Sequence, residues 1–258
     1  MQIVVEEVSN KKQFRDFVDL PYSLYKGHRY YVPPLRFDEA ATLNKTKNPA
    51  FDYCDARYWV AYRGNKPVGR IAAICNHSFI DKWGKKYLRF GWFDFEENEQ
   101  VANILLKQVE DWGKELQMEA VHGPLGFTDL DHEGMLIEGF EHVGTMAAGY
   151  NYSYYPLFIE KLGYQKDTDW LEFRVNVPSK MDEKLEKLSS MVSRRYGFKA
   201  LTFKKSKEVL PYANQIFDLI NEAYSELYGV VPLTRKQYEY YTKQYFSFMR
   251  PDFISLVT

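Results

Sequence analysis

The sequence is poor in cysteine and has no long apolar run. Its two cysteines, Cys54 and Cys75, lack the spacing of a metal site, and one disulfide would be a weak stabiliser in a chain of 258 residues, so we expect two reduced thiols. The apolar runs reach only strand length, and the N-terminus has no basic segment followed by an apolar one. Both features disfavour a transmembrane helix and a signal peptide, so a cytoplasmic protein is expected.

Net charge is also nearly absent. The formal charge of −1 lacks the excess of basic residues that a dedicated nucleic-acid-binding protein shows. The chain contains no Ser-His-Asp nucleophile elbow, no phosphate-binding P-loop and no zinc-protease helix motif. These absences argue against nucleic acid as a partner and against several large enzyme classes.

Aromatic residues and an internal repeat are what the sequence does have. Aromatic residues make up 17% of the chain, with 21 tyrosines, which suggests aromatic-lined grooves or an extensive interface between modules. Residues 22–25 and 32–36 are echoed about 200 residues later by residues 224–228 and 231–235. The strand-like run after the first copy, residues 58–62, continues into further structure, whereas its counterpart at 253–257 ends the sequence. We therefore predict one complete module and the front part of a second.

Hydrophobic periodicity gives the expected order of elements. Ser9 or Asn10 is expected to cap the first helix, which contains Phe14, Phe17 and Val18. The long helix at 98–116 joins two strands, which we expect to be parallel because parallel neighbours need a long connection. The predicted strands are 3–8, 58–63, 67–75, 87–95, 120–122, 170–177 and 198–203, and the later helices are 156–162, 211–228 and 234–249.

A linking helix is predicted between the two modules. Ser179 is expected to cap it. An apolar stripe along the helix would dock the second module, and this stripe consists of Met181, Leu185, Leu188 and Met191/Val192. The residues of the second module expected to contact it are Tyr212, Ile216, Leu219, Ile220 and Tyr224. The last strand, 253–257, would lie at the edge of the first module's sheet or in a contact between chains. A homo-oligomer formed through this incomplete unit is therefore an open expectation.

The order of elements resembles that of the GCN5-related N-acetyltransferase (GNAT) family. Residues 158–164, with the sequence Phe-Ile-Glu-Lys-Leu-Gly-Tyr, are similar to the segment that ends many GNAT cofactor sites, and residues 67–71 look like the family's third strand. The resemblance implies an α/β fold with a mixed, mostly antiparallel sheet flanked by helices, followed by a partial second GNAT-like unit. The corresponding domains are 1–177, a linking helix at 178–197, and 198–258, in an arrangement similar to tandem GNAT acyl and aminoacyl transferases.

The same resemblance implies acetyl-CoA or another acyl-CoA as co-substrate, and no metal. In the family the pyrophosphate lies on backbone amides at the start of the long helix, where unpaired N–H groups and the helix dipole attract an anion. The matching residues here are Phe93, Phe95, Asn98, Gln100, Val101 and Ala102. Only Ala102 fits the family's glycine-rich pattern, and Glu96, Glu97 and Glu99 surround the site, so a weakened or altered CoA site is expected.

Catalytic candidates also follow from the resemblance. Ile159 occupies the position of the family's general acid, a tyrosine, and Tyr154 or Tyr155 could substitute for it one helical turn upstream, or else serve only in packing. A carboxylate in the region of Asp94 and Glu96 would be the general base.

A glycine-rich insert at 123–153 supplies the candidate acceptor site. Its acidic residues have no lysine or arginine beside them and could line a pocket for a cationic amine, although a solvated loop is the alternative interpretation. Adjacent loop residues rarely converge on one ion, so a metal site is disfavoured. The candidate substrate-binding residues are Asp129, Asp131, His132 and Glu133.

Together these features predict an acyl-CoA-dependent N-acyltransferase that acts on a small-molecule or lipid-type amine. Two alternatives remain open. One is a GNAT-fold module that has lost catalysis and serves in binding or scaffolding. The other is a long-chain acyl or aminoacyl transferase, with the abundant aromatic residues forming an apolar tunnel.

Overall fold

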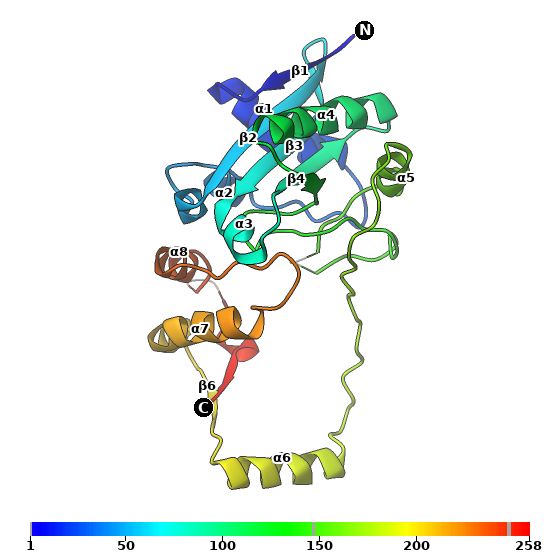
Figure 1. Ribbon diagram of the computed structural model, residues 1–258. Coiled ribbons are helices and arrows are strands. Elements are labelled where there is room, and N and C mark those ends of the chain that lie inside the picture. The colour runs from blue at the N-terminus through cyan, green and yellow to red at the C-terminus, as the bar shows by residue number, and fades with distance from the viewer. Residues whose placement is uncertain (1, 146–147, 247–248) are drawn as a thin grey trace. The chain divides into compact units, whose positions relative to one another are not determined.

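The computed structural model describes residues 2–145, 148–246 and 249–258 (Figure 1). The chain divides into two compact units. The first contains Met1–Asp169 together with Tyr224–Pro232, and the second contains Trp170–Ala223 and Leu233–Thr258. The short segment 224–232 therefore belongs with the first unit, although its neighbours in sequence belong to the second.

The first unit is built on a five-stranded sheet in the order β1-β2-β3-β4-β5. Neighbouring strands are antiparallel except β4 and β5, which are parallel as expected. The strands are β1 (Ile3–Glu7), β2 (Cys54–Arg63), β3 (Lys66–Asn76), β4 (Tyr87–Phe95) and β5 (Ala120–His122).

Helices cover both faces of this sheet (Figure 1). On one face α4 (Glu99–Glu115) buries Val101, Leu105 and Val109 against the strands. On the other face α1 (Lys11–Leu24) buries Phe17 and Val18. The remaining helices of the unit are α2 (Arg36–Thr42), α3 (His77–Trp83), α5 (Tyr154–Lys161) and the 3-10 turn η1 (Pro49–Asp52). The predicted fold class, a mixed and mostly antiparallel sheet flanked by helices, is confirmed.

Local sequence explains where the two main helices begin. The Asn10 side chain accepts hydrogen bonds from the backbone N–H groups of Lys12 and Gln13, so Asn10 rather than Ser9 is the N-cap of α1. Asn98 caps α4 in the same way. Gly69 lets α4 lie close to β3, because a Cβ there would come within 2.8 Å of side-chain atoms of Val101 and Leu105. The two cysteines are free and point to opposite faces of the sheet, with Cys54 on the α1 side and Cys75 on the α4 side.

The second unit has its own small core. Phe217, Tyr238 and Tyr241 pack together between α7 (Ala213–Ala223) and α8 (Arg235–Tyr245). Two short strands, β6 (Ala200–Thr202) and β7 (Ser255–Val257), pair antiparallel. The other elements are α6 (Glu183–Tyr196) and the 3-10 turns η2 (Ser206–Glu208), η3 (Leu210–Tyr212) and η4 (Pro251–Phe253). Residues 247–248 of the helix expected at 234–249, and residues 146–147 of the insert, lie outside the described residues.

Several expectations for the region after residue 169 were wrong. The segment 170–177 forms no strand, and Asp182, not Ser179, caps α6. β7 pairs with β6 of its own unit instead of the first module's sheet. Ile216 and Ile220 pack on the core of α7 and α8, while the apolar stripe of α6 is exposed. The alternating pattern at 170–177 predicts a strand only if a partner edge is available, and no described strand pairs with it.

Among the helices formed by the described residues, we find none with the length and apolar character needed to cross a lipid bilayer.

Candidate active site at the end of strand β4

A bulge in β4 sets the geometry of the site. Arg70 of β3 lies opposite Asp94 and Ala72 lies opposite Gly91, so β4 contains one extra residue between these pairs. Trp92 adopts a φ of +44° within the bulge, a conformation that non-glycine residues rarely take. As a result Asp94 and Arg70 point to the same face of the sheet as cross-strand partners.

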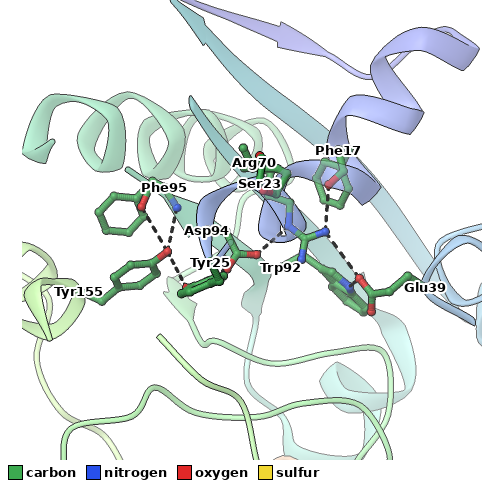
Figure 2. A network of polar contacts seen from close by, with 10 residues as sticks. Phe17, Ser23, Tyr25, Glu39, Arg70, Trp92, Asp94, Phe95 and Tyr155 are labelled. Carbon is green, nitrogen blue, oxygen red and sulfur yellow. Dashed lines mark hydrogen bonds and ion pairs between the residues drawn. The ribbon is translucent and has the colours of Figure 1, made fainter. Parts of the chain in front are cut away.

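Arg70 is the centre of a buried polar network (Figure 2). Its Nε donates to Asp94 Oδ2 at 2.7 Å and its Nη1 donates to the Phe17 carbonyl at 2.9 Å. Glu39 Oε2 lies 3.5 Å from Nη1 and accepts a hydrogen bond from the Trp92 indole at 3.0 Å. Burial alone would lower the pKa of Arg70, but Asp94 and Glu39 outweigh it and the pKa is raised. The guanidinium is therefore a permanent cation that neutralises Asp94.

Two tyrosine hydroxyls extend the network from Asp94 to the strand end (Figure 2). Tyr25, which follows α1, donates to Asp94 Oδ1 at 3.3 Å and is 3.0 Å from the Tyr155 hydroxyl. The Tyr155 oxygen accepts the backbone N–H of Phe95 at 2.9 Å. Burial raises the pKa of both phenols well above the usual value, and the nearby Asp94 raises it further. Both hydroxyls therefore stay protonated and act as hydrogen-bond donors.

Tyr154 is the more accessible of the two tyrosines that the sequence suggested as acids. Its hydroxyl donates to the Phe95 carbonyl at 2.6 Å, and the residue is only partly buried, whereas Tyr155 is fully buried. Burial also raises the pKa of Tyr154. The ring of Tyr154 belongs to a column of nearly parallel rings formed by Tyr154, Tyr152, Tyr25 and Tyr31, with centroids 5.4, 4.9 and 4.1 Å apart.

The candidate CoA residues separate into core side chains and helix-start residues. The side chains of Phe93, Phe95, Val101 and Ala102 are buried in the core between α4 and the sheet, so only their backbone groups are available to a ligand. Asn98 accepts the Gln100 N–H at 2.9 Å as the helix cap. The two polar residues therefore stand at the start of α4, as the resemblance implies.

The acidic residues around this helix start are less repulsive than expected. Glu96 forms an ion pair with Arg63, and Glu99 lies 3.3 Å from the ammonium of Lys161. Of these three glutamates, Glu97 alone forms no ion pair with a residue that the structure describes. Cations thus accompany two of the three glutamates, which reduces the predicted obstacle to a phosphate group at this helix N-terminus.

The acidic residues of the insert fall into two groups. Asp131 Oδ2 accepts the N–H groups of Phe127 and Thr128 at 2.8 and 3.0 Å, so this carboxylate holds the loop in place. Asp129 and Glu133 share a side-chain hydrogen bond. Burial and the neighbouring Asp129 raise the pKa of Glu133 to about 8, and burial raises that of Asp131 to about 6.

Two of the insert's predicted substrate residues, Asp129 and Glu133, therefore come together, while Asp131 has a structural role. His132, the fourth, is exposed and takes part in interactions of its own. No cluster of three or more potential metal ligands occurs among residues 2–145, 148–246 and 249–258.

A second buried arginine, Arg89 of β4, contacts the insert. Its Nη1 donates to the Gly126 carbonyl at 3.0 Å and its Nη2 donates to the Gly229 carbonyl at 2.6 Å, so it joins the insert to the segment 224–232. Its Nε is buried without a partner, and it forms no ion pair with any described residue. Burial lowers its pKa.

Sequence reasoning missed Tyr25, Arg70, Glu39 and Trp92. A signal for Arg70 is present: it is a single charged residue inside the apolar strand run that continues to Cys75, and buried charges are normally paired. Tyr25 belongs to the repeated Tyr-rich segment but has no spacing that marks it as a site residue. The partnership of these residues depends on the bulge, which sequence periodicity does not reveal.

Comparison with known proteins gives two relatives at the sequence level. Protein YghO of Escherichia coli is 28% identical over 240 residues, covering 92% of this chain and 60% of that protein. The bacterial ceramide synthase of Caulobacter vibrioides is 23% identical over 234 residues, covering 89% of this chain and 60% of that protein. The chain thus spans about 60% of the length of both relatives. No model of a known protein family matches it.

Solved structures with a similar arrangement include acetyltransferases. An aminoglycoside N-acetyltransferase in complex with CoA is 12% identical with a TM-score of 0.41, covering 68% of this chain and 96% of that one. A tandem GNAT protein from the clavulanic acid biosynthesis pathway is 12% identical with a TM-score of 0.42, covering 63% of this chain and 43% of that one. At TM-scores below 0.5 these similarities assign neither a substrate nor a site.

Proposed function

We propose that the chain is an acyl-CoA-dependent N-acyltransferase that acts on an amine, with its active site at the end of β4. The observation that supports this best is Asp94, a carboxylate anchored by Arg70 and Tyr25 at the strand end that leads into α4. Its side chain is 13% exposed, so it is fixed yet reachable. A carboxylate held in one orientation next to a helix N-terminus combines a proton acceptor with a site for an anionic group.

Each residue then has a defined role. Asp94 receives the proton that the amine loses as its nitrogen attacks the thioester carbonyl. Tyr154 supplies the proton that the departing thiolate takes when the carbon–sulfur bond breaks, and its partial exposure favours it over the buried Tyr155. The first-turn amides of α4 hold the pyrophosphate, and Arg63 and Lys161 offset the nearby glutamates.

We further propose a lipid-type amine acceptor and a long acyl chain. Similarity to a bacterial ceramide synthase over most of this chain supports this choice, since a ceramide is the amide of a fatty acid with a long-chain amino alcohol. The Asp129 and Glu133 pair in the insert offers carboxyl groups to a cationic amine. An ammonium beside Glu133 would favour its ionised form and offset the effect of burial.

For the rest of the chain, we keep the proposal that residues 198–258 correspond to the front of a second GNAT-like domain. A homo-oligomer through that region and a cytoplasmic location also remain proposals.

Calorimetric titration and product analysis test the function. The protein is titrated with acetyl-CoA and with palmitoyl-CoA, and each mixture is then incubated with a long-chain amino alcohol and analysed for amide by mass spectrometry. We expect the long-chain donor to bind and to yield amide with release of free thiol. Binding and turnover of acetyl-CoA alone would contradict the long-chain assignment. Binding of neither donor would favour the non-catalytic scaffold.

A further inference from the structure

Residues 26–37, which lead from the end of α1 into the first turn of α2, expose apolar side chains beside basic ones. Val32, Leu35 and Phe37 are 66%, 58% and 71% exposed. Lys26 and Arg29 are exposed too, and neither forms an ion pair within the described residues. Between residues 20 and 37 the sequence contains three basic residues and no carboxylate. Clustered exposed apolar residues of this kind mark interaction surfaces.

The segment is fixed to the body of the first unit. The ring of Tyr31 stacks on Tyr25 with centroids 4.1 Å apart. The Tyr22 hydroxyl donates to the Pro34 carbonyl, and the guanidinium of Arg36 lies 3.6 Å from the Tyr22 ring centroid while its Nε donates to Asp19 at 2.6 Å. These anchors present Val32, Leu35 and Phe37 outward as a defined surface.

The composition of this surface matches a lipid interface. Aliphatic and aromatic side chains enter the boundary between headgroups and acyl chains, and neighbouring lysines and arginines attract anionic headgroups. We propose that residues 26–37 are the surface through which this protein binds an anionic lipid bilayer. Lys26 and Arg29 favour a membrane over an apolar protein partner, because the phosphates of anionic headgroups would pair with these two cations.

The position of the segment links this surface to the candidate active site. Tyr31 stacks on Tyr25, whose hydroxyl contacts Asp94, and Glu39 follows directly in α2 with its carboxylate near Arg70. A bilayer bound at residues 26–37 would bring a lipid amine close to Asp94. This second step depends on the proposed function, whereas membrane binding itself does not.

Vesicle sedimentation tests the membrane contact. The full chain is mixed with vesicles of phosphatidylcholine alone or of phosphatidylcholine with phosphatidylglycerol, at low and high salt. We expect binding to the anionic vesicles that weakens with salt, and little binding to the neutral ones. Absence of binding to anionic vesicles at low salt would overturn the proposal.

Variants with matched controls locate the contact. The combined change Val32→Ser, Leu35→Ser and Phe37→Ser should reduce vesicle binding at least tenfold. Each of these side chains contributes to the affinity when it leaves water and enters the bilayer. Since all three side chains are exposed, the urea midpoint of unfolding should stay close to that of the wild type.

The control for apolar loss lies in α6, where Leu185, Leu188 and Met191 are 57%, 52% and 60% exposed. Because α6 carries Arg194 and Arg195 in its last turn as well as Glu183 and Glu186 in its first, it is a rival apolar and basic surface, and the proposal requires that Leu185→Ser, Leu188→Ser and Met191→Ser leave vesicle binding unchanged. Loss of binding in this control but not in the 26–37 variant would transfer the contact to α6 and contradict the proposal.

The control for charge uses lysines outside the segment. Lys26→Ser with Arg29→Ser should weaken binding to anionic vesicles about fivefold per residue, whereas Lys204→Ser with Lys205→Ser should not. Equal effects would indicate non-specific attraction and overturn the assignment.

Sedimentation equilibrium without vesicles gives a further outcome: a dimer lost on changing Val32, Leu35 and Phe37 would mean that a second copy covers this surface.

Activity separates this proposal from the proposed function. A protein that binds anionic vesicles through residues 26–37 but forms no amide with any donor retains the membrane contact and refutes the transferase. A protein that acylates amines in solution but does not bind vesicles supports the transferase and refutes the membrane contact.

Discussion

The two buried arginines of the first unit, Arg70 and Arg89, stand on neighbouring strands but are compensated differently. Arg70 has a carboxylate at 2.7 Å and a second at 3.5 Å, and its pKa is raised. Arg89 has two main-chain carbonyls and no ion pair with the described residues, and its pKa is lowered by burial. Arg70 thus fixes a negative charge at the candidate active site, whereas Arg89 connects backbone segments.

This difference gives the two sites different dependence on pH and on mutation. A buried ion pair becomes costly when one partner is removed, because the other charge is left unpaired in a medium that solvates it poorly. A buried cation bound only by carbonyls leaves polar but uncharged groups behind. The predictions below run from the largest expected effect to the smallest.

Arg70→Met should have the largest effect on stability. It leaves Asp94 and Glu39 without their buried cation, and we expect a loss of about 3–5 kcal/mol in the free energy of unfolding by urea. The control is Arg57→Met, since Arg57 pairs with Glu115 at an exposed position and should contribute about 0–1 kcal/mol. An Arg70 variant as stable as the Arg57 variant would contradict the role assigned to this pair.

Glu133→Gln should change how the stability of the protein depends on pH, because the Glu133 carboxyl is buried beside Asp129. The pKa of Glu133 is about 8 in the folded protein against an ordinary value of 4.5, so the folded state favours the protonated form. The wild type should therefore lose stability as pH rises from about 5 to above 8, while the variant should not. The stability difference between variant and wild type should shift in favour of the variant by about 2–4 kcal/mol from pH 5 to pH 9.

Urea unfolding at both pH values measures this shift. Asp111→Gln serves as the control, because Asp111 is exposed on α4 and paired with lysines. The same difference between Glu133→Gln and wild type at pH 5 and pH 9 would mean that Glu133 is already ionised in the folded protein.

Arg89→Met should cost less than Arg70→Met. The carbonyls of Gly126 and Gly229 lose a donor each, but the cost of burying a cation is removed, so we expect a net loss of about 1–2 kcal/mol. Amide hydrogen exchange should increase in residues 224–232, since Arg89 holds this segment to the first unit. A stability loss equal to that of Arg70→Met, with exchange in 224–232 unchanged, would refute the distinction between the two arginines.

The sequence predicted the scaffold of this site better than its contacts. Strand and helix periodicity, the Asn10 cap and the long helix before β5 are local or depend on one pattern of burial, and all appear in the structure. The resemblance named Asp94, Tyr154 and Tyr155 as candidates, and the structure places the hydroxyls of both tyrosines beside Phe95 at the end of β4. Their interactions were not predictable, since Tyr155 meets Tyr25 across 130 residues of sequence.

Two expectations depended on partners that the sequence does not reveal. Residues 170–177 alternate like a strand, but a strand forms only when another edge supplies hydrogen bonds. Glu96 and Glu99 are anionic in sequence, but Arg63 and Lys161 accompany them in three dimensions. Pattern alone cannot identify a partner that is distant in the chain.

The most direct test of the central claim is the rate of amide formation by Asp94→Asn, measured as kcat with palmitoyl-CoA and a long-chain amino alcohol. Glu39→Gln is the matched control, because it also removes a carboxylate from Arg70 but has no proposed contact with the substrate. If Asp94 receives the proton of the amine, its loss should lower kcat about 10²–10⁴-fold while KM for the acyl-CoA changes little, and Glu39→Gln should have a much smaller effect. A folded Asp94→Asn protein with a kcat within about tenfold of the wild type would contradict the assignment of Asp94 as the base.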